Sequence, residues 1–199
     1  MARKLSGIGG HSKKISGSRR YYLTVIILDL GCGNKRRPGT IGVDFSSRFE
    51  PDVIHDLNEF PYPFEGGSID KIYLDNVLEH LENPLRVMEE IHRITKSGAE
   101  VVVVVPYFRS RWAAIDMTHK TLFTVDSFAY FDPTNEICTR YDYTDARFTI
   151  KKRVFNEEVK SNFVKEFLVK LANRFPNSYE NLLSHLIPLD DITFHLLRI

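Results

Sequence analysis

Carboxylate side chains stand at the ends of several short apolar segments of the sequence. Asp29 lies within the first segment, Asp44 ends the second, and Asp56 follows the third. Ligands of open α/β sheets bind beyond the carboxyl ends of the strands, so these carboxylates are expected to face one ligand. There Asp44 can accept hydrogen bonds from both hydroxyls of a ribose, and Asp56 can accept one from an adenine amino group. Each residue alone would equally suit a turn, but their coincidence favours a nucleoside.

A glycine turn follows the first segment directly. Gly31 and Gly33 flank Cys32, and glycines in this spacing tolerate positive φ and let the backbone approach a ligand closely. A dinucleotide fingerprint needs a third glycine where Arg36 stands and an acidic residue about 20 positions on. The third glycine is missing and Asp44 comes much sooner, so a nucleoside without a pyrophosphate fits better than NAD. An NAD-dependent dehydrogenase is therefore the less favoured alternative.

The elements that must position these residues alternate along the chain. Strands are predicted over 23–30, 40–45, 52–55, 68–74 and 100–105. Between the last two strands, a helix is predicted to begin at Pro84, with Asn83 as its cap, and to end at Gly98. In the final third of the chain, the residue pattern predicts a strand over 147–155, helices over 157–175 and 179–187, and a last strand over 191–199. This alternation predicts one open α/β sheet, mostly parallel, with an antiparallel hairpin at its edge.

Length and composition are those of one ordinary globular domain. The chain has 199 residues, of which 43% are hydrophobic and 27% are charged. Its two cysteines, Cys32 and Cys138, make neither a disulfide framework nor a zinc cluster. The apolar runs are far too short to cross a bilayer and no secretory signal is recognisable, so a cytoplasmic protein is expected. The histidines and cysteines also lack the spacings typical of metal ligands, so no metal site is expected.

The first 20 residues differ from the rest of the chain in charge. They contain six basic residues and no acidic one. The remainder is mildly acidic, which argues against a broad nucleic-acid-binding surface. We expect a flexible basic arm over 1–20 and a single domain over 21–199. The arm is either a solvated terminus or a segment that binds a phosphate-rich partner.

Taken together, these motifs resemble those of class I S-adenosylmethionine-dependent methyltransferases. The resemblance rests on 27–34, 41–44 and 52–57, and the segments 64–81, 93–98 and 103–106 are similar to the small type 11 methyltransferases. It implies a Rossmann-like, open twisted sheet of about seven strands, mostly parallel with an antiparallel last strand, and helices on both faces. It also implies S-adenosylmethionine as the cofactor, held by Asp29, Gly31, Cys32 and Gly33 at the methionine, Asp44 at the ribose, Asp56 and Leu57 at the adenine, and Asn76 near the sulfonium. Phe45, beside Asp44, is also expected to bind the cofactor.

One connection departs from the pattern of that family. Residues 34–40 contain Pro38 and Gly39 and are too few for the crossover helix that usually joins the first two strands. We therefore expect no full helix there. Part of the cofactor wall is then expected to come from the loop itself or from the N-terminal arm.

Two histidines are candidates for roles beside the cofactor. His80 follows the fourth predicted strand and either contacts the cofactor or has a structural role, holding the start of the next helix or the glycine turn. His119 lies in a long aromatic connection after the fifth strand, where 116–119 resembles a segment near the acceptor pocket of type 11 relatives. His119 is the candidate general base, because an unperturbed imidazole accepts a proton near neutral pH. The alternative is a histidine that only packs the loop.

The function implied by the resemblance is transfer of a methyl group by in-line displacement. The acceptor is expected to be a small molecule, and the basic arm leaves a protein or RNA acceptor open. The rival from another class is a non-catalytic module on the same fold that binds an adenosyl ligand or a partner protein.

Overall fold

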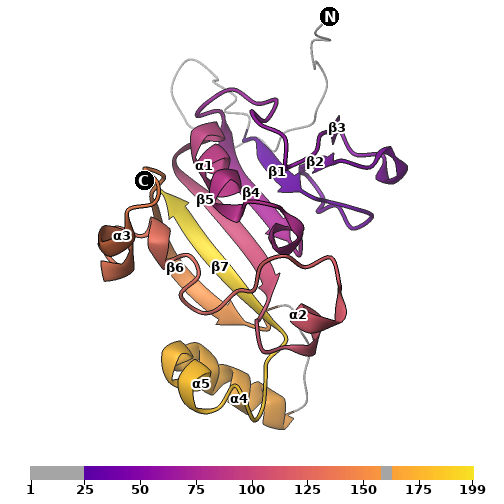
Figure 1. The fold of residues 1–199 in the computed structure, drawn as a ribbon. Coiled ribbons are helices and arrows are strands. Elements are labelled where there is room, and N and C mark those ends of the chain that lie inside the picture. Colours follow the sequence, from indigo (N-terminus) through magenta and orange to yellow (C-terminus); the bar gives the residue numbers. More distant parts are fainter. Residues whose placement is uncertain (1–24, 158–162) are drawn as a thin grey trace, which may run out of the picture.

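Seven strands form one sheet in the computed structural model, which describes residues 25–157 and 163–199 (Figure 1). The strands are β1 (Ile27–Leu30), β2 (Ile41–Asp44), β3 (Val53–Ile54), β4 (Ile69–Asp75), β5 (Thr95–Pro106), β6 (Phe148–Phe155) and β7 (Asp191–Arg198). Their order across the sheet is β3-β2-β1-β4-β5-β7-β6, and β7 runs antiparallel to both of its neighbours. The predicted fold class, a mostly parallel Rossmann-like sheet with an antiparallel last strand, is confirmed. The predicted basic arm over 1–20 lies outside the described residues.

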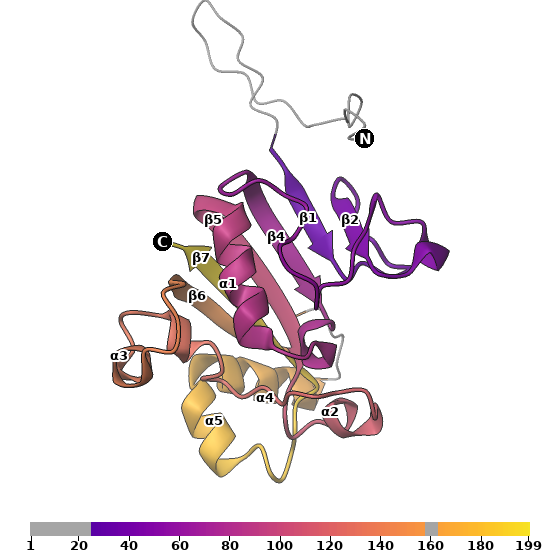
Figure 2. The ribbon, with the colours of Figure 1, turned by 45° about the horizontal axis from the view of Figure 1, so that its top comes forward.

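The α-helices are short, and all five that the structure describes follow β4. They are α1 (Pro84–Ile94), α2 (Arg111–Ile115), α3 (Glu136–Tyr141), α4 (Phe163–Arg174) and α5 (Pro176–Leu182), with 3-10 turns η1 (Ser47–Phe49), η2 (Leu78–His80) and η3 (Ala129–Phe131). Figures 1 and 2 show α1 lying over β4 and β5, while α4 and α5 gather near the ends of β6 and β7. The sheet is therefore most thickly covered away from β2 and β3.

Some predicted boundaries are wrong. The helix that begins at Pro84 ends at Ile94 and not at Gly98, and β5 begins directly after it at Thr95. The Thr95 hydroxyl donates to the carbonyl of Ile91 over 2.7 Å, which satisfies an acceptor of the last turn and marks the change to extended backbone. The predicted helix over 179–187 is α5, which starts three residues earlier because Pro176 suits the first helical position. Residues 23–24 and 158–162 of two other predicted elements lie outside the described ranges.

The core that holds the site-bearing strands lies between α1 and the sheet. α1 begins as predicted, with the Asn83 side chain accepting a hydrogen bond from the amide of Arg86. Its apolar stripe and the strand side chains beneath it are almost fully buried: Val87, Met88, Ile91, Ile94, Leu28, Leu30, Ile72, Leu74, Val101 and Val103. Full burial of each such side chain contributes about 1.5–3 kcal/mol. The carboxyl ends of β1 and β4 are therefore fixed relative to each other.

The connection between β1 and β2 contains no regular helix, as predicted from its length. Arg37 holds it against the sheet. The Arg37 amide donates to the Asp29 carboxylate over 2.7 Å, and the guanidinium lies 4.7 Å above the Tyr73 ring and 3.1 Å from Asp75. Arg36 adds an ion pair with Asp52, so two arginines of this connection tie it to the segments around the sheet.

The long connection from β5 to β6 crosses the carboxyl edge of the sheet. Its first residue, Tyr107, is fully buried and forms a bridge to Phe123. Further along, the amides of Lys120 and Thr121 donate to the carbonyl of Glu79 over 2.8 and 3.3 Å. These bonds fix the loop against η2. Among the described residues, no helix is long and apolar enough to pass through a membrane.

Candidate active site

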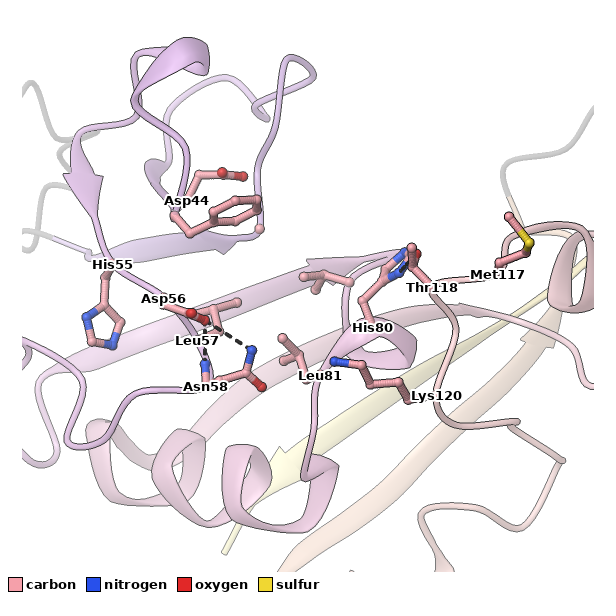
Figure 3. A pocket seen from close by; sticks show the side chains of 13 residues that line it. Asp44, His55, Asp56, Leu57, Asn58, His80, Leu81, Met117, Thr118 and Lys120 are labelled. Atoms are coloured by element: carbon pink, nitrogen blue, oxygen red, sulfur yellow. Dashed lines mark hydrogen bonds between the residues drawn. The ribbon is translucent and has the colours of Figure 1, made fainter.

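A cavity of about 680 Å³ opens at the carboxyl edge of β1, β2 and β4 (Figure 3). Six of the ten residues predicted to bind the cofactor line it: Gly31, Asp44, Phe45, Asp56, Leu57 and His80. The other lining residues, which sequence reasoning did not select, are His55, Asn58, Val77, Leu81, Met117, Thr118 and Lys120. They are neighbours of selected residues or belong to the loop after β5, whose length and aromatic content had pointed to a functional segment.

The glycine turn is shaped by its contact with Val77. Gly31 has φ +70°, and a Cβ at this position would lie 2.4 Å from Cγ2 of Val77, so only glycine fits. The amides of Gly31 and Cys32 both donate to the carbonyl of Val43. The turn therefore wraps around the end of β2, and its backbone faces the cavity at Gly31.

Asp44 joins the glycine turn to the segment after β2. Its side chain is buried, and one carboxylate oxygen accepts from the amide of Gly33 while the other accepts from the amide of Ser46, each over 2.9 Å. A carboxylate oxygen has two lone pairs, so both oxygens retain acceptor capacity toward the cavity. Asp44 can thus hold a diol and brace the turn at the same time.

The far side of the cavity combines a buried aliphatic residue with polar and aromatic ones. Leu57 is almost fully buried, whereas the exposed Asp56 carboxylate accepts two hydrogen bonds from Asn58 (Figure 3). Phe45 is 73% exposed although it lines the cavity. An exposed aromatic ring above an apolar floor suits a flat heteroaromatic group such as adenine.

Four predicted cofactor residues, Asp29, Cys32, Gly33 and Asn76, do not line this cavity. Asp29 is buried and turned toward the amide of Arg37, and burial raises the pKa of its carboxyl. The Cys32 thiol is buried close to the position a Gly42 side chain would occupy, and burial also raises its pKa. The Asn76 side chain donates to Asp75. In the structure, these four residues belong to the glycine turn or lie at the strand ends beside it.

On the acceptor side, the loop after β5 is bonded to η2 by a chain of polar groups. The Thr118 hydroxyl donates to the Asp116 carboxylate over 2.7 Å and lies 2.8 Å from Nδ1 of His80. Figure 3 shows His80 and Thr118 side by side at the cavity wall. Burial, with His119 nearby, lowers the pKa of His80. His80 therefore lines the cavity and anchors the loop after β5, whereas the structural role predicted for it lay at the helix start or the glycine turn.

Glu79 and His119 meet directly behind this wall. Nε2 of His119 lies 4.0 Å from Oε1 of Glu79, and Nδ1 of His119 lies 3.1 Å from the carbonyl oxygen of Ala113. Glu79 is 1% exposed, and burial raises the pKa of its carboxyl to about 8. The His80 and His119 rings meet edge to face with 4.6 Å between centroids. Sequence spacing gave no sign of this cluster because His119 comes from a different connection.

The cavity at the carboxyl edge, the glycine turn and the strand order define a Rossmann-like fold of the methyltransferase class. Residues 28–103 match the type 11 family model, which describes a methyltransferase domain. The matched part of the chain is similar to that domain, and the resemblance seen in the sequence is confirmed. The predicted enzyme class and the prediction of S-adenosylmethionine as cofactor are confirmed with it.

Solved structures share the fold over most of the chain. A S-adenosylmethionine-dependent methyltransferase from Mesorhizobium loti is 15% identical, with a TM-score of 0.55 over 98% of this chain and 94% of that one. One from Archaeoglobus fulgidus is 20% identical, with a TM-score of 0.52 over 87% and 86%. A Haemonchus contortus phosphoethanolamine N-methyltransferase in complex with S-adenosyl-L-methionine is 14% identical, with a TM-score of 0.50 over 87% and 48%. None of the curated proteins matches the chain. At these identities the likeness establishes the fold.

Proposed function

We propose that this protein transfers a methyl group from S-adenosylmethionine to a small-molecule acceptor. The observation that carries the proposal is the single cavity that joins the glycine turn, the Asp44 carboxylate and the loop after β5. The first two belong to the cofactor half of the site. The loop contributes Met117, Thr118 and Lys120 to the opposite side, where an acceptor would enter.

In the proposed complex the cofactor lies along the carboxyl edge of β1 and β2. The backbone at Gly31 faces the methionine end, the Asp44 carboxylate accepts the ribose hydroxyls, and Asp56 with Leu57 and Phe45 surrounds the adenine. Charge-assisted hydrogen bonds of the kind expected at Asp44 contribute about 1.5–3 kcal/mol each. The phosphoethanolamine N-methyltransferase described above has S-adenosyl-L-methionine in a similar fold, which supports this arrangement.

Methyl transfer from a sulfonium needs little chemical activation by the protein. The sulfonium leaving group departs readily as a thioether, so the protein mainly aligns the acceptor in line with the methyl carbon and excludes water. The side chain of Met117 is 98% exposed and lies at the cavity rim. Closure of this apolar side chain over a bound acceptor would remove water from the reacting atoms.

An acceptor that must lose a proton also needs a base, and His119 is the proposed one. Its Nδ1 faces a carbonyl oxygen and must donate to it, so in the neutral ring Nε2 carries the lone pair. His119 lies behind the lining residues, so a base role needs the 116–120 loop to move aside. Replacing His119 with Phe should then lower turnover about 10²-fold while cofactor affinity stays nearly unchanged.

The test is a ligand panel followed by an acceptor screen. Calorimetry should show binding of S-adenosylmethionine and of its demethylated product, and no binding of NAD. A screen of small molecules with labelled cofactor should then transfer label to at least one of them. Binding of the cofactor without transfer to any acceptor, including protein and RNA, would favour the non-catalytic module, and binding of NAD alone would reject the proposal.

A further inference from the structure

We infer that Glu79, His80 and His119 form a binding site for a divalent first-row transition-metal ion at the wall of the cavity. One carboxylate oxygen of Glu79 and one ring nitrogen of each histidine lie within 4.8 Å of one another. One carboxylate and two imidazoles are a ligand set used by zinc and iron enzymes. Cation binding does not depend on the proposed function, whereas its role in activating an acceptor does.

Hydrogen bonds to the far side of each imidazole prepare both rings as ligands. Since the Asp116 carboxylate only accepts, the Thr118 hydroxyl donates to it and must itself accept from Nδ1 of His80. By the same argument the carbonyl of Ala113 accepts from Nδ1 of His119. Both neutral rings therefore keep the lone pair on Nε2. Such outer hydrogen bonds typically orient metal-binding histidines.

When Glu79 is ionised, the two groups that face each other across the cluster both lack a hydrogen to share. Nε2 of His119 and Oε1 of Glu79 are 4.0 Å apart, too far for a hydrogen bond and each an acceptor in these states. A positive ion between two such lone pairs turns a repulsive arrangement into an attractive one. Tetrahedral bonds of roughly 2.0–2.2 Å would bring these two atoms to about 3.3–3.6 Å, so the side chains must draw together by several tenths of an ångström around a bound ion.

Glu79 supplies independent evidence for a ligand. Its side chain is 1% exposed, yet neither carboxylate oxygen has a hydrogen-bond partner within the ranges the structure describes. A buried carboxylate without a partner is strongly unfavourable. A protonated Glu79 does not remove the difficulty, because its hydroxyl would still need an acceptor.

The position of the cluster indicates what the ion would do. His80 lines the cavity, so an ion bound to it lies at the side where the loop after β5 meets the acceptor space. Three protein ligands leave at least one coordination position open. An acceptor hydroxyl on that position would lose its proton to solvent more readily, and its oxygen would form the bond to the methyl carbon as the carbon–sulfur bond breaks. With the ion bound, His119 holds the metal and the ion activates the acceptor.

The experiment measures cation binding on the full chain after chelator treatment, without S-adenosylmethionine. Titration with Zn²⁺ by calorimetry, and with Co²⁺ by visible absorption, should show one equivalent bound. Glu79→Gln and His119→Asn should each weaken binding by about 100-fold or more, and Thr118→Val by about 10-fold through loss of the outer hydrogen bond. His185→Asn, which removes an exposed histidine from another part of the chain, should leave binding unchanged.

The melting temperature of each variant shows that it is folded, and a separate titration with S-adenosylmethionine tests the cofactor site. Equal cation affinity in wild type, Glu79→Gln and His119→Asn would overturn the inference, as would a wild-type protein that binds the cofactor and no cation. Cation binding with no cofactor binding would instead leave the metal site standing and reject the proposed function.

Discussion

The backbone amide of Arg37 donates a hydrogen bond to the carboxylate of Asp29 across 2.7 Å. Asp29 lies in the middle of a strand that is otherwise apolar, and it would be costly there without a donor. The donor comes from the short connection that stands in place of a crossover helix. This bond therefore indicates that Asp29 holds the connection in place, whereas the family resemblance implied that it contacts the methionine of the cofactor.

Replacing Asp29 with Ala should destabilise the protein by about 1–3 kcal/mol, because the Arg37 amide loses its acceptor in a largely buried place. Asp29→Asn, which keeps an acceptor oxygen, should cost less. Urea denaturation of the three proteins gives the comparison. If both variants unfold at the wild-type urea concentration and only cofactor affinity falls, Asp29 is a ligand-binding residue instead.

Asp44→Ala should weaken S-adenosylmethionine binding at least about tenfold, since the ribose loses its charged acceptor. The bonds to the amides of Gly33 and Ser46 add a second effect, namely a looser glycine turn and a lower melting temperature. Asp44→Asn keeps one acceptor oxygen and should separate these effects, with a smaller loss of stability. Calorimetry and melting curves on the same preparations measure both. Unchanged affinity in Asp44→Ala would rule out the ribose assignment.

Gly31→Ala should disrupt the turn far more than Gly39→Ala. Both glycines have positive φ, of +70° and +78°, so each substitution carries the left-handed backbone penalty of roughly 1–2 kcal/mol. Only at Gly31 does the new Cβ meet another residue, 2.4 Å from Cγ2 of Val77, whereas nothing lies within 4 Å at Gly39. Cofactor titrations should show binding lost in Gly31→Ala and kept in Gly39→Ala. Equal behaviour of the two variants would contradict this account of the turn.

Asp191 makes stability depend on pH. Burial, with the charges of Asp190 and Asp75, raises its pKa to about 6, above the ordinary value of 3.8. The folded state therefore binds this proton more tightly than the unfolded chain, so Asp191 lowers stability as pH rises from about 4 to about 6. Asp191→Asn should remove this contribution and stabilise the protein by about 1–3 kcal/mol at pH 7.

Urea denaturation of wild type and Asp191→Asn at several pH values between 4 and 7 checks this prediction. The two proteins should differ little near pH 4 and diverge toward pH 7. Parallel pH profiles with a constant offset would show that Asp191 does not titrate in this range.

Sequence reasoning predicted well what depends on local pattern. The capped start of α1 at Asn83 and the carboxylate that ends β2 are both local signals, and the structure bears out both positions. The predicted end of α1 at Gly98 is wrong. Glycine commonly ends helices and Gly98 does have a positive φ, but the helix already ends at its C-cap residue Thr95, whose hydroxyl donates to the carbonyl of Ile91. The direction of a side chain also cannot be predicted from the sequence pattern. Asn76, for example, donates a hydrogen bond to the Asp75 side chain.

The cluster behind the cavity wall could not be predicted from spacing. Glu79 and His80 follow β4, whereas His119 follows β5, and their meeting depends on the loop bonded to the carbonyl of Glu79. That packing is a property of the folded chain. The sequence-based expectation that there is no metal site considered only ligands close together in the chain, and it stays a prediction that cation titration can test.

The two edges of the sheet bear on how this protein resists aggregation. An edge strand offers unpaired amides and carbonyls to any other extended chain, and proteins block such growth with short strands, lysines and bulges. β3 has only two residues, and β6 carries exposed Lys151 and Lys152 with a register shift between Ile150 and Lys152. All three devices are therefore present, and addition of foreign strands, which is the first step toward amyloid-like growth, is opposed at both ends of the sheet.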